Sequence, residues 1–254
     1  MRLLLSPANP LLKRVRRLAR GRRRDPRFLL EGRKLVQAAL ETGIGIECAL
    51  VARGRATDDV RALEARGVEV VEVPEKLFRE ASTLDSPEGI LAVARRPARS
   101  VSELAPEGVV LVSAGIQDPG NLGALARIAE AAGARALVLL KGSADPFAPK
   151  ALRGSMGSLL RIPVFEIDDI GALSKRGFRL AALVPRGGVD FREANWTLPV
   201  ALLLGRESSG LDDATVAVSD LRVSIPMRGA VESLNVATAA ALVLYEANRR
   251  MLGA

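Results

Sequence analysis

The sequence predicts an α/β protein of two domains, the second of them built around a parallel sheet. Short apolar segments alternate with helical segments along most of the 254 residues, and this alternation implies a parallel sheet covered by helices on both faces. The apolar run at residues 109–112 is typical of a buried parallel strand. Residues 96–107 carry two prolines and charges of both signs. We therefore expect a linker there, between domains at residues 1–95 and 108–254.

The expected elements follow in order along the chain. Asn9 and Pro10 suit the N-cap and first turn of a helix that ends near Gly21. The first domain should then contain strands at residues 28–30, 46–51, 68–73 and 90–94, and helices at 34–41, 58–66 and 74–82. The second should contain strands at 109–112, 136–140, 162–165, 179–184, 200–204 and 221–223, with helices that include 122–132 and 233–250.

The positive charge is concentrated in the N-terminal segment. The chain has a net charge of +8, but residues 1–35 hold twelve Lys or Arg and two acids, a net charge of +10. The remaining 219 residues hold 25 basic and 27 acidic residues, a net charge of −2. A uniformly basic surface would favour nonspecific binding, whereas a localised basic segment favours docking onto a polyanion such as nucleic acid.

The first predicted helix carries most of this charge. Its apolar residues at 11, 12, 15 and 18 share one face, and basic residues cover much of the rest. Two interpretations compete. The helix has an ordinary solvated face, or it contacts phosphates, which we favour because so many like charges repel one another without a polyanion. The Arg-rich start also resembles an organellar transit peptide. The candidate nucleic-acid-binding residues are Lys13, Arg14, Arg16, Arg17, Arg20, Arg22, Arg23 and Arg24.

Two scarce residue types exclude whole classes of chemistry. The chain has no histidine, which excludes Ser-His-Asp and Cys-His nucleophile systems, His-ligated metals and an imidazole base. Its one cysteine, Cys48, excludes zinc ribbons, Cys-ligated iron–sulfur clusters and intrachain disulfides. No apolar run approaches the roughly 20 residues that span a bilayer. We therefore expect a cytoplasmic protein that needs neither metal nor membrane.

A strand, a glycine-rich turn and a helix form the first candidate site, at residues 111–132. The glycine spacing does not fit G-x-G-x-x-G, and Lys141 follows the next strand where a dinucleotide site has an acid. A nicotinamide cofactor is therefore not expected. Asn121 suits the helix N-cap, and Arg127 lies six residues later among alanines and leucines. Arg127 either pairs with a core carboxylate or is held by its helix at a phosphate or ribose.

Two further loops follow predicted strands. The strand at 200–204 runs directly into the G-x-E-x-x-G sequence of residues 205–210, at the end of a parallel strand where ligands bind. The segment 225–236 has the sequence IPMRGAVESLNV. Its Ser233 and Asn235 open the last helix, in which Ser233 could be simply an N-cap.

In this order and spacing, the three motifs resemble the signatures of the SpoU (TrmH-type) class of SPOUT RNA 2′-O-ribose methyltransferases, over residues 108–250. Ser6, Asn9, Pro10, Lys13 and residues 28–32 more loosely resemble the substrate-binding domain that precedes this catalytic domain in many members. The resemblance implies a smaller, ribosomal-protein-like α/β RNA-binding domain, followed by a parallel-sheet domain with a trefoil knot. It also argues against a transit peptide.

The family's activity implies S-adenosylmethionine as cofactor and a ribose 2′-hydroxyl of structured RNA as substrate, with large-subunit ribosomal RNA as the first expectation. It also implies a homodimer through the C-terminal domain, in which two subunits complete each site. Carried over by position, the residues that would hold the cofactor, largely through their backbone, are Gly205, Ile225, Pro226, Met227 and Leu234, with the loop after Leu183 and Val184 as a wall.

The same resemblance assigns the activating group to Arg127. Glu207 would orient Arg127 or the motif loops, and the residues that would position Arg127 and the RNA are Asn121, Ser233 and Asn235. Arginine rarely deprotonates in proteins. Arg127 is therefore either the base itself or a stabiliser of the developing alkoxide while water or RNA phosphate takes the proton.

Two other functions stay open. The same fold could act on a base or on transfer RNA, and the chain could be an RNA-binding module without catalysis. A two-domain layout with a basic N-terminal unit favours ribosomal RNA, by analogy alone. A cofactor-binding titration would separate a binding module from an enzyme.

Overall fold

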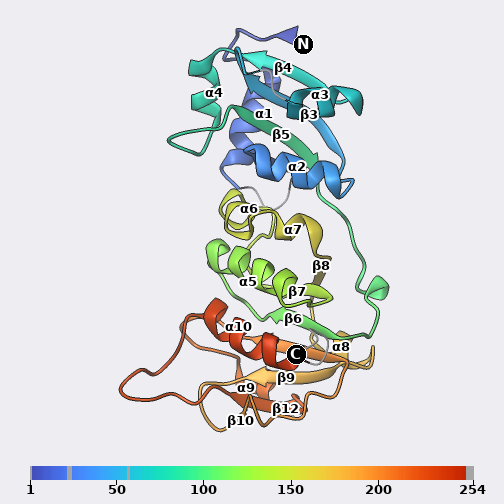
Figure 1. Ribbon diagram of the computed structural model, residues 1–254, viewed down its shortest axis with the longest axis vertical. Helices are drawn as coiled ribbons and strands as arrows, with labels where there is room; N and C mark the ends of the chain where they lie inside the picture. The colour runs from blue at the N-terminus through green and yellow to red at the C-terminus, as the bar shows by residue number, and fades with distance from the viewer. Residues whose placement is uncertain (1, 22–24, 56–57, 250–254) are drawn as a thin grey trace. The chain divides into compact units, whose positions relative to one another are not determined.

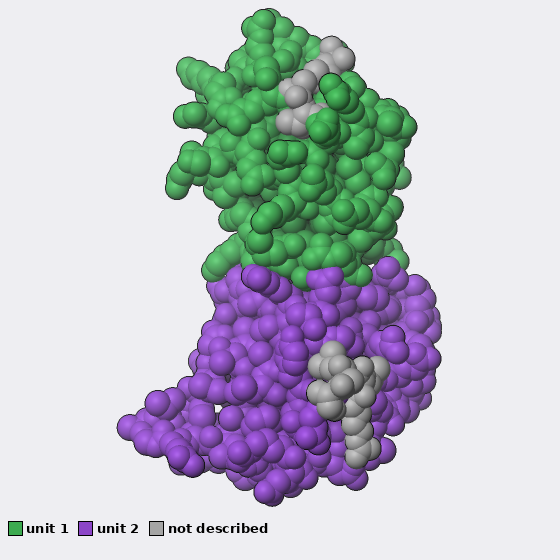
Figure 2. Space-filling view, viewed as in Figure 1, with its two compact units in different colours: residues 1–98, 145–161 green, residues 99–144, 162–254 purple. Residues whose placement is uncertain are grey.

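The computed structural model describes residues 2–21, 25–55 and 58–249. They form two compact units, shown as ribbons in Figure 1 and in two colours in Figure 2. Unit 1 is drawn from residues 1–98 and 145–161, and unit 2 from residues 99–144 and 162–254. Residues 145–161 thus pack with unit 1, although the sequence places them inside the second domain.

Unit 1 is built on a five-stranded mixed sheet with the strand order β1-β4-β3-β5-β2. Strand β4 is parallel to β1 and β3, whereas β5 is antiparallel to β3 and β2. The strands are β1 (Arg2–Leu3), β2 (Arg27–Glu31), β3 (Ile46–Ala52), β4 (Glu69–Val73) and β5 (Ile90–Arg95). The helices are α1 (Pro10–Ala19), α2 (Arg33–Glu41), α3 (Asp58–Ala65), α4 (Glu75–Ala81), α6 (Pro149–Ser155) and α7 (Ser158–Arg161).

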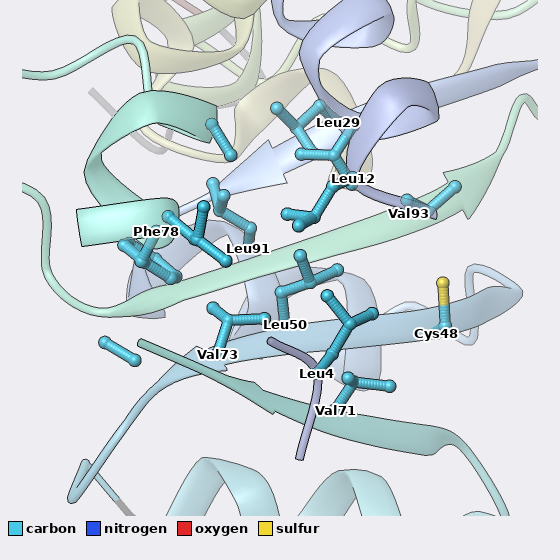
Figure 3. Close-up of a cluster of buried hydrophobic side chains, with 14 of the residues drawn as sticks. Leu4, Leu12, Leu29, Cys48, Leu50, Val71, Val73, Phe78, Leu91 and Val93 are labelled. Atoms are coloured by element: carbon cyan, nitrogen blue, oxygen red, sulfur yellow. The ribbon is translucent and has the colours of Figure 1, made fainter. Parts of the chain in front are cut away.

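Helix α1 begins as the sequence predicts. The Oδ1 atom of Asn9 accepts a hydrogen bond from the Leu11 amide at 2.8 Å, and Pro10 occupies the first turn. The apolar face of α1 packs with α4 onto one face of the sheet, which leaves the basic residues on the outer face. Figure 3 shows this core, whose labelled members are Leu4, Leu12, Leu29, Cys48, Leu50, Val71, Val73, Phe78, Leu91 and Val93.

The segment 145–161 is anchored in unit 1 by a largely buried ion pair. Both carboxylate oxygens of Asp145 accept hydrogen bonds from the Arg96 guanidinium, at 2.7 and 2.6 Å. The same guanidinium lies 5.2 Å from the ring centroid of Phe147, which in turn packs against Phe28 at 4.7 Å. An ion pair, a cation–π contact and an aromatic pair therefore fix the start of this segment.

Unit 2 is built on a seven-stranded sheet in which every pair of neighbours is parallel, as predicted, with the order β10-β12-β9-β11-β6-β7-β8. Its strands are β6 (Val109–Ser113), β7 (Ala136–Leu140), β8 (Val164–Ile167), β9 (Arg179–Leu183), β10 (Val189–Asp190), β11 (Val200–Leu204) and β12 (Leu221–Ser224). Its helices are η1 (Val101–Glu103), α5 (Pro119–Ala131), α8 (Gly171–Ser174), α9 (Asp213–Ala217) and α10 (Val236–Ala247).

Both faces of this sheet are covered. Residues from η1 and α8 pack on one face, in a cluster with alternate residues of β6, β7 and β11. Helices α5 and α10 pack against each other and contact the sheet. The central strands β6 and β11 are buried along their whole length. This explains their continuous apolar sequences, since a strand covered on both faces has no solvent side.

Two helix starts differ from the expectation. Helix α5 begins at Pro119 rather than near Leu122, and its N-cap is Asp118, whose Oδ1 accepts from the Asn121 amide at 2.8 Å. Helix α10 begins at Val236 with Asn235 as N-cap, so Ser233 is not the cap. In both cases a neighbouring Asx residue supplies the capping oxygen. Strand β8 lies two residues later than predicted, and the two-residue strands β1 and β10 are too short to show periodicity.

We expect Asp145→Ala to lower the free energy of unfolding by about 2 kcal/mol. The side chains of Arg96 and Asp145 are 16% and 9% exposed, and truncation of Asp145 removes two charge-assisted hydrogen bonds from a largely buried guanidinium. The matched control is Asp58→Ala, whose side chain is 91% exposed beside Arg61, where a change below about 0.5 kcal/mol is expected. Urea-induced unfolding followed by circular dichroism measures both. Equal effects would contradict the anchoring role of Asp145.

Candidate functional site

The candidate loops of unit 2 leave the sheet at one edge. The neighbouring strands β12, β9, β11 and β6 are parallel, so their carboxyl ends lie side by side. Two backbone hydrogen bonds continue this alignment beyond the strands: the Val184 amide donates to Val223 O at 2.9 Å, and the Ala114 amide donates to Leu204 O at 2.8 Å. Open α/β sheets bind ligands at this edge.

The G-x-E-x-x-G sequence folds into a tight turn directly after β11. Arg206 and Gly210 exchange two backbone hydrogen bonds, of 3.0 and 2.9 Å. A Cβ atom on Gly205 would lie 2.0 Å from the carbonyl carbon of Gly210, so only glycine permits this approach. Gly210 has a φ of +69°, which also favours glycine. The motif thus specifies a backbone shape that places Glu207 in the turn.

Two consecutive side-chain hydrogen bonds join the three sequence motifs. Asn121 Nδ2 donates to Glu207 Oε1 at 2.9 Å, and Asn235 Nδ2 donates to Asn121 Oδ1 at 3.2 Å. Because Asp118 caps helix α5, the side chain of Asn121 is free to make both bonds. The three side chains lie 86 and 114 positions apart in sequence. We call Asn121, Glu207 and Asn235 the motif node.

Arg127 lies outside the motif node. Its six-residue offset from Asn121 corresponds to about 9 Å along the helix axis and about 120° around it. Its side chain is exposed and makes no ion pair or hydrogen bond with the part of the chain that the structure describes. Within one chain, Glu207 therefore binds Asn121 and not Arg127, and no core carboxylate pairs with Arg127. Ser233 is likewise exposed and makes no hydrogen bond with the described residues.

The loop at residues 225–234 joins β12 to α10 (Figure 1). Over residues 2–21, 25–55 and 58–249, no hydrogen bond involves its backbone N–H or C=O groups. Pro226 is exposed, and the half-buried apolar side chains here and after β9 are Leu183, Val184, Ile225, Met227 and Leu234. Free donors and acceptors beside half-buried apolar surface fit a ligand that carries a heterocycle and an aliphatic chain.

The candidate nucleic-acid interface lies on the outer face of α1 in unit 1. Lys13 and Arg20 are exposed and form no ion pair with described residues. The other three described basic residues are paired: Arg14 with Glu47 at 3.9 Å, Arg16 with Glu80 at 2.6 Å and Arg17 with Asp25 at 2.8 Å. Acids from other elements thus reduce the like-charge repulsion that we inferred from the sequence. Arg22, Arg23 and Arg24 lie outside the described residues.

The structure contains a second cluster of basic residues, which the sequence did not reveal. Arg27 and Arg95 are directly opposite in the antiparallel β2–β5 pair, and both donate to Glu47, at 2.7 and 2.8 Å. The hydrogen bond from Arg27 is the largest of the contacts that hold the pKa of Glu47 below its ordinary value. With Arg14, three cations surround one carboxylate, so a surplus of positive charge remains. Cross-strand register, which the sequence does not show, brings these residues together.

Neither a metal-binding cluster nor a membrane-spanning helix is found among the described residues. Among the described residues, no group of three or more Cys, Asp or Glu side chains could hold a metal ion. Within the same ranges, no helix is long and apolar enough to cross a membrane.

Comparison with known protein families assigns both parts of the chain. Residues 108–245 match the SpoU rRNA methylase family, and residues 9–92 match the MRM3-like substrate-binding domain. The first match includes all three members of the motif node, and the second includes the described basic residues of α1.

Individual relatives agree with this assignment. The chain is 35% identical to the 23S rRNA (guanosine(2553)-2′-O)-methyltransferase RlmP of Bacillus subtilis, over 86% of this chain and 87% of the relative. It resembles the AdoMet-bound rRNA methyltransferase of Sinorhizobium meliloti with a TM-score of 0.90 and 30% identity, over 98% of each chain. It resembles the SpoU methyltransferase AviRb of Streptomyces viridochromogenes, in complex with AdoMet, with a TM-score of 0.84 and 29% identity, over 96% of this chain and 98% of the other. The chain therefore belongs to the SpoU rRNA methylase family.

Proposed function

We propose that this protein transfers a methyl group from S-adenosylmethionine to a ribose 2′-hydroxyl of ribosomal RNA. The observation that carries the proposal is the motif node, because it brings the three family signatures to one edge of a parallel sheet. Further support comes from RlmP, which is named a 23S rRNA 2′-O-methyltransferase, and from related structures that hold AdoMet. Such a substrate implies a cytoplasmic protein.

RNA binding and methyl transfer belong to different domains in this proposal. Residues 1–95 bind the RNA through the basic face of α1, and residues 96–107 are a linker. Residues 108–254, apart from the segment 145–161 that packs with unit 1, form the methyltransferase domain with the family's trefoil knot. The charge distribution supports this division, since the net charge is +10 over residues 1–35 and −2 over the rest. Only eight residues are aromatic, so base stacking contributes less to RNA binding than phosphate contacts do.

The cofactor site lies at the loops after β9, β11 and β12. The free backbone groups of residues 225–234 and the half-buried side chains of Leu183, Val184 and Leu234 would hold the adenine and methionine parts. Gly205 keeps the neighbouring turn close to the strand. When bound there, S-adenosylmethionine supplies an electrophilic methyl group.

The chain's own residues orient the ribose and assist loss of its proton. Asn121 and Asn235 hold the RNA at the motif node, Glu207 fixes the side chain of Asn121, and Ser233 lies on the adjoining loop. Arg127 takes the proton of the 2′-hydroxyl as base, or it stabilises the oxygen as negative charge develops while water or an RNA phosphate takes the proton. Arginine is an effective stabiliser because its charge persists at neutral pH.

A second copy of the chain would complete the site. Helix α10 exposes Leu242 and Tyr245, which are 43% and 47% exposed and lie one turn apart. Exposed apolar side chains on a helix next to α5 fit a homodimer interface through the C-terminal domain. Arg127, which is unpaired within the described chain, would then act at a site assembled from two subunits.

Incubation of the protein with labelled S-adenosylmethionine and deproteinised cellular RNA tests the proposed activity. We expect label in large-subunit ribosomal RNA, at one nucleotide that resists alkaline cleavage because its 2′-oxygen is methylated. Label in transfer RNA or on a base would identify another substrate and contradict the proposal. Cofactor binding without transfer to any RNA would indicate a binding module.

We expect Arg127→Ala to abolish methyl transfer while the dissociation constant for S-adenosylmethionine stays within about twofold of wild type, because Arg127 lies outside the cofactor loops. The matched control is Arg135→Ala, since Arg135 follows the same helix, is half exposed and makes a long, 3.9 Å ion pair with Glu107. Steady-state kinetics and calorimetric titration measure the two effects. Wild-type turnover in Arg127→Ala would exclude the assigned role.

We expect the unpaired cations of α1 to contribute most of the salt dependence of RNA binding. Each lost phosphate contact reduces the slope of log K against log [salt] by about 0.7–0.9. The double variant Lys13→Gln/Arg20→Gln should therefore reduce the slope by about 1.5. The double variant Arg16→Gln/Arg17→Gln should reduce the slope by less, because those two charges are already paired with acids. Arg61→Gln, on the exposed face of α3, is the control. An unchanged slope in the first variant would show that this face does not contact RNA.

A further inference from the structure

A concave site lies at the carboxyl edge of the unit 2 sheet, beside the proposed cofactor loops. It is a pocket of about 280 Å³, formed by the chain after β6, β7 and β11 and by α9. Its polar lining consists of Lys141, Arg206, Ser209, Asp212 and Thr215, and Gly115 forms part of the wall. Of the proposed cofactor loops, it shares only the turn after β11.

The pocket occupies the point at which the strand order reverses. From β6 the chain continues to β7 on one side, whereas from β11 it continues to β12 on the other, and β6 and β11 are neighbours. The loops after these two strands therefore diverge and leave a crevice between them. Such a switch point is the general ligand site of open α/β sheets.

The charges in this crevice favour an anion. Lys141 and Arg206 are exposed and form no ion pair with residues that the structure describes. Asp212 is the N-cap of α9, and its Oδ1 accepts from the Thr215 amide at 2.7 Å. This backbone hydrogen bond, with a smaller contribution from the charge of Arg206, keeps the pKa of Asp212 below its ordinary value. Two cations and one carboxylate therefore leave a net charge of about +1 at neutral pH.

The backbone holds Arg206 in place. Its amide and carbonyl are both bonded to Gly210, and its side chain lies against Gly115, where a Cβ atom would come within 3.0 Å of Arg206 Nε. Gly115 also has a φ of +88°. Glycine at this position thus permits both the turn and the close packing of the Arg206 side chain on the β6–α5 loop.

We propose that this pocket binds a phosphodiester group of the RNA strand beside the methylated ribose, through Arg206 and Lys141. The proposal rests on the proposed methyltransferase function and adds a substrate contact to it. A phosphodiester carries one negative charge, and the guanidinium of Arg206 can donate two parallel hydrogen bonds to it. S-adenosylmethionine is a poorer fit, since its sulfonium and ammonium groups are cations. No residue of the lining is aromatic, so the pocket offers no platform for base stacking.

The pocket adjoins the motif node through consecutive residues. Glu207, which bonds to Asn121, directly follows Arg206. A phosphate bound at Arg206 would therefore place the attached ribose near the node. Arg206 and Lys141 are positioning residues in this arrangement, because they contact the strand and not the reacting oxygen.

The test compares Lys141→Gln and Arg206→Gln with Lys175→Gln. Lys175 is exposed and precedes β9, at the amino edge of the same sheet, so its substitution removes the same charge away from the pocket. For each pocket variant we expect KM for deproteinised 23S rRNA to rise about tenfold, with kcat and the S-adenosylmethionine dissociation constant within twofold of wild type. Lys175→Gln should change none of them.

Fluorescence anisotropy with a labelled 23S rRNA fragment provides a readout that needs no methyl transfer. Each pocket variant should lose about 0.7 from the slope of log K against log [salt]. If the wild-type protein binds this RNA without methylating it, the proposed function fails while the slopes still test the pocket. Unchanged KM and slope in both variants would overturn the phosphate site, as would a loss of cofactor affinity in both.

Inorganic phosphate separates an RNA contact from a site for a free anion. Calorimetric titration of the wild-type protein with phosphate should show only weak, millimolar binding that Arg206→Gln abolishes, because most of the affinity comes from the attached strand. Tight phosphate binding, combined with unchanged KM for RNA in the variants, would assign the pocket to a small anion and contradict the proposal.

Discussion

The parallel arrangement of the unit 2 sheet determines where chemistry can occur in this protein. Because all neighbouring strands run in one direction, the loops after β6, β9, β11 and β12 emerge at a single edge. Strands covered on both faces must be apolar throughout, so polar and glycine residues with functional roles are confined to the loops that follow them. The proposed cofactor loops, the motif node and the proposed phosphate pocket are consequences of this constraint. The two backbone hydrogen bonds beyond the strand ends, Val184 to Val223 and Ala114 to Leu204, keep adjacent loops in register.

The motif node shows how three separate segments become one site without a buried core of their own. Asn121, Glu207 and Asn235 are exposed or half-buried, so their hydrogen bonds contribute little to the free energy of folding. These hydrogen bonds instead fix the positions of the three motif segments relative to one another. Asp118 supplies the capping oxygen of α5, so Oδ1 of Asn121 is left to accept from Asn235. Asn235 itself caps α10 through its Oδ1 and bonds to Asn121 through its Nδ2. A local choice of cap residue therefore makes a long-range contact available.

In unit 1, acidic residues neutralise part of the positive charge of helix α1. The basic helix is not an array of free cations, because acids on other elements pair with Arg14, Arg16 and Arg17. These partly exposed pairs are individually weak, and phosphate groups can compete for the same guanidinium groups. Pairing lets the domain fold with its arginines close together, and the clustering of Arg14, Arg27 and Arg95 around Glu47 retains a positive surplus. The segment 145–161 adds the Arg96–Asp145 contact to the same unit.

The sequence by itself determined the parallel sheet, the order of most elements, the cap of α1 and the family, because periodicity, capping residues and motif spacing are local properties. It also grouped Asn121, Glu207 and Asn235 with Arg127 and Ser233, of which the structure joins only the first three by hydrogen bonds. Only the tertiary structure decided that Asp118 caps α5, that Glu207 bonds to Asn121 rather than Arg127, and that residues 145–161 pack with unit 1. The Arg27–Glu47–Arg95 cluster and the Lys141–Arg206 pocket likewise depend on strand register and strand order. Apart from the local cap at Asp118, these features are contacts between residues far apart in the chain, and the geometry that brings them together is set by packing rather than by any local pattern.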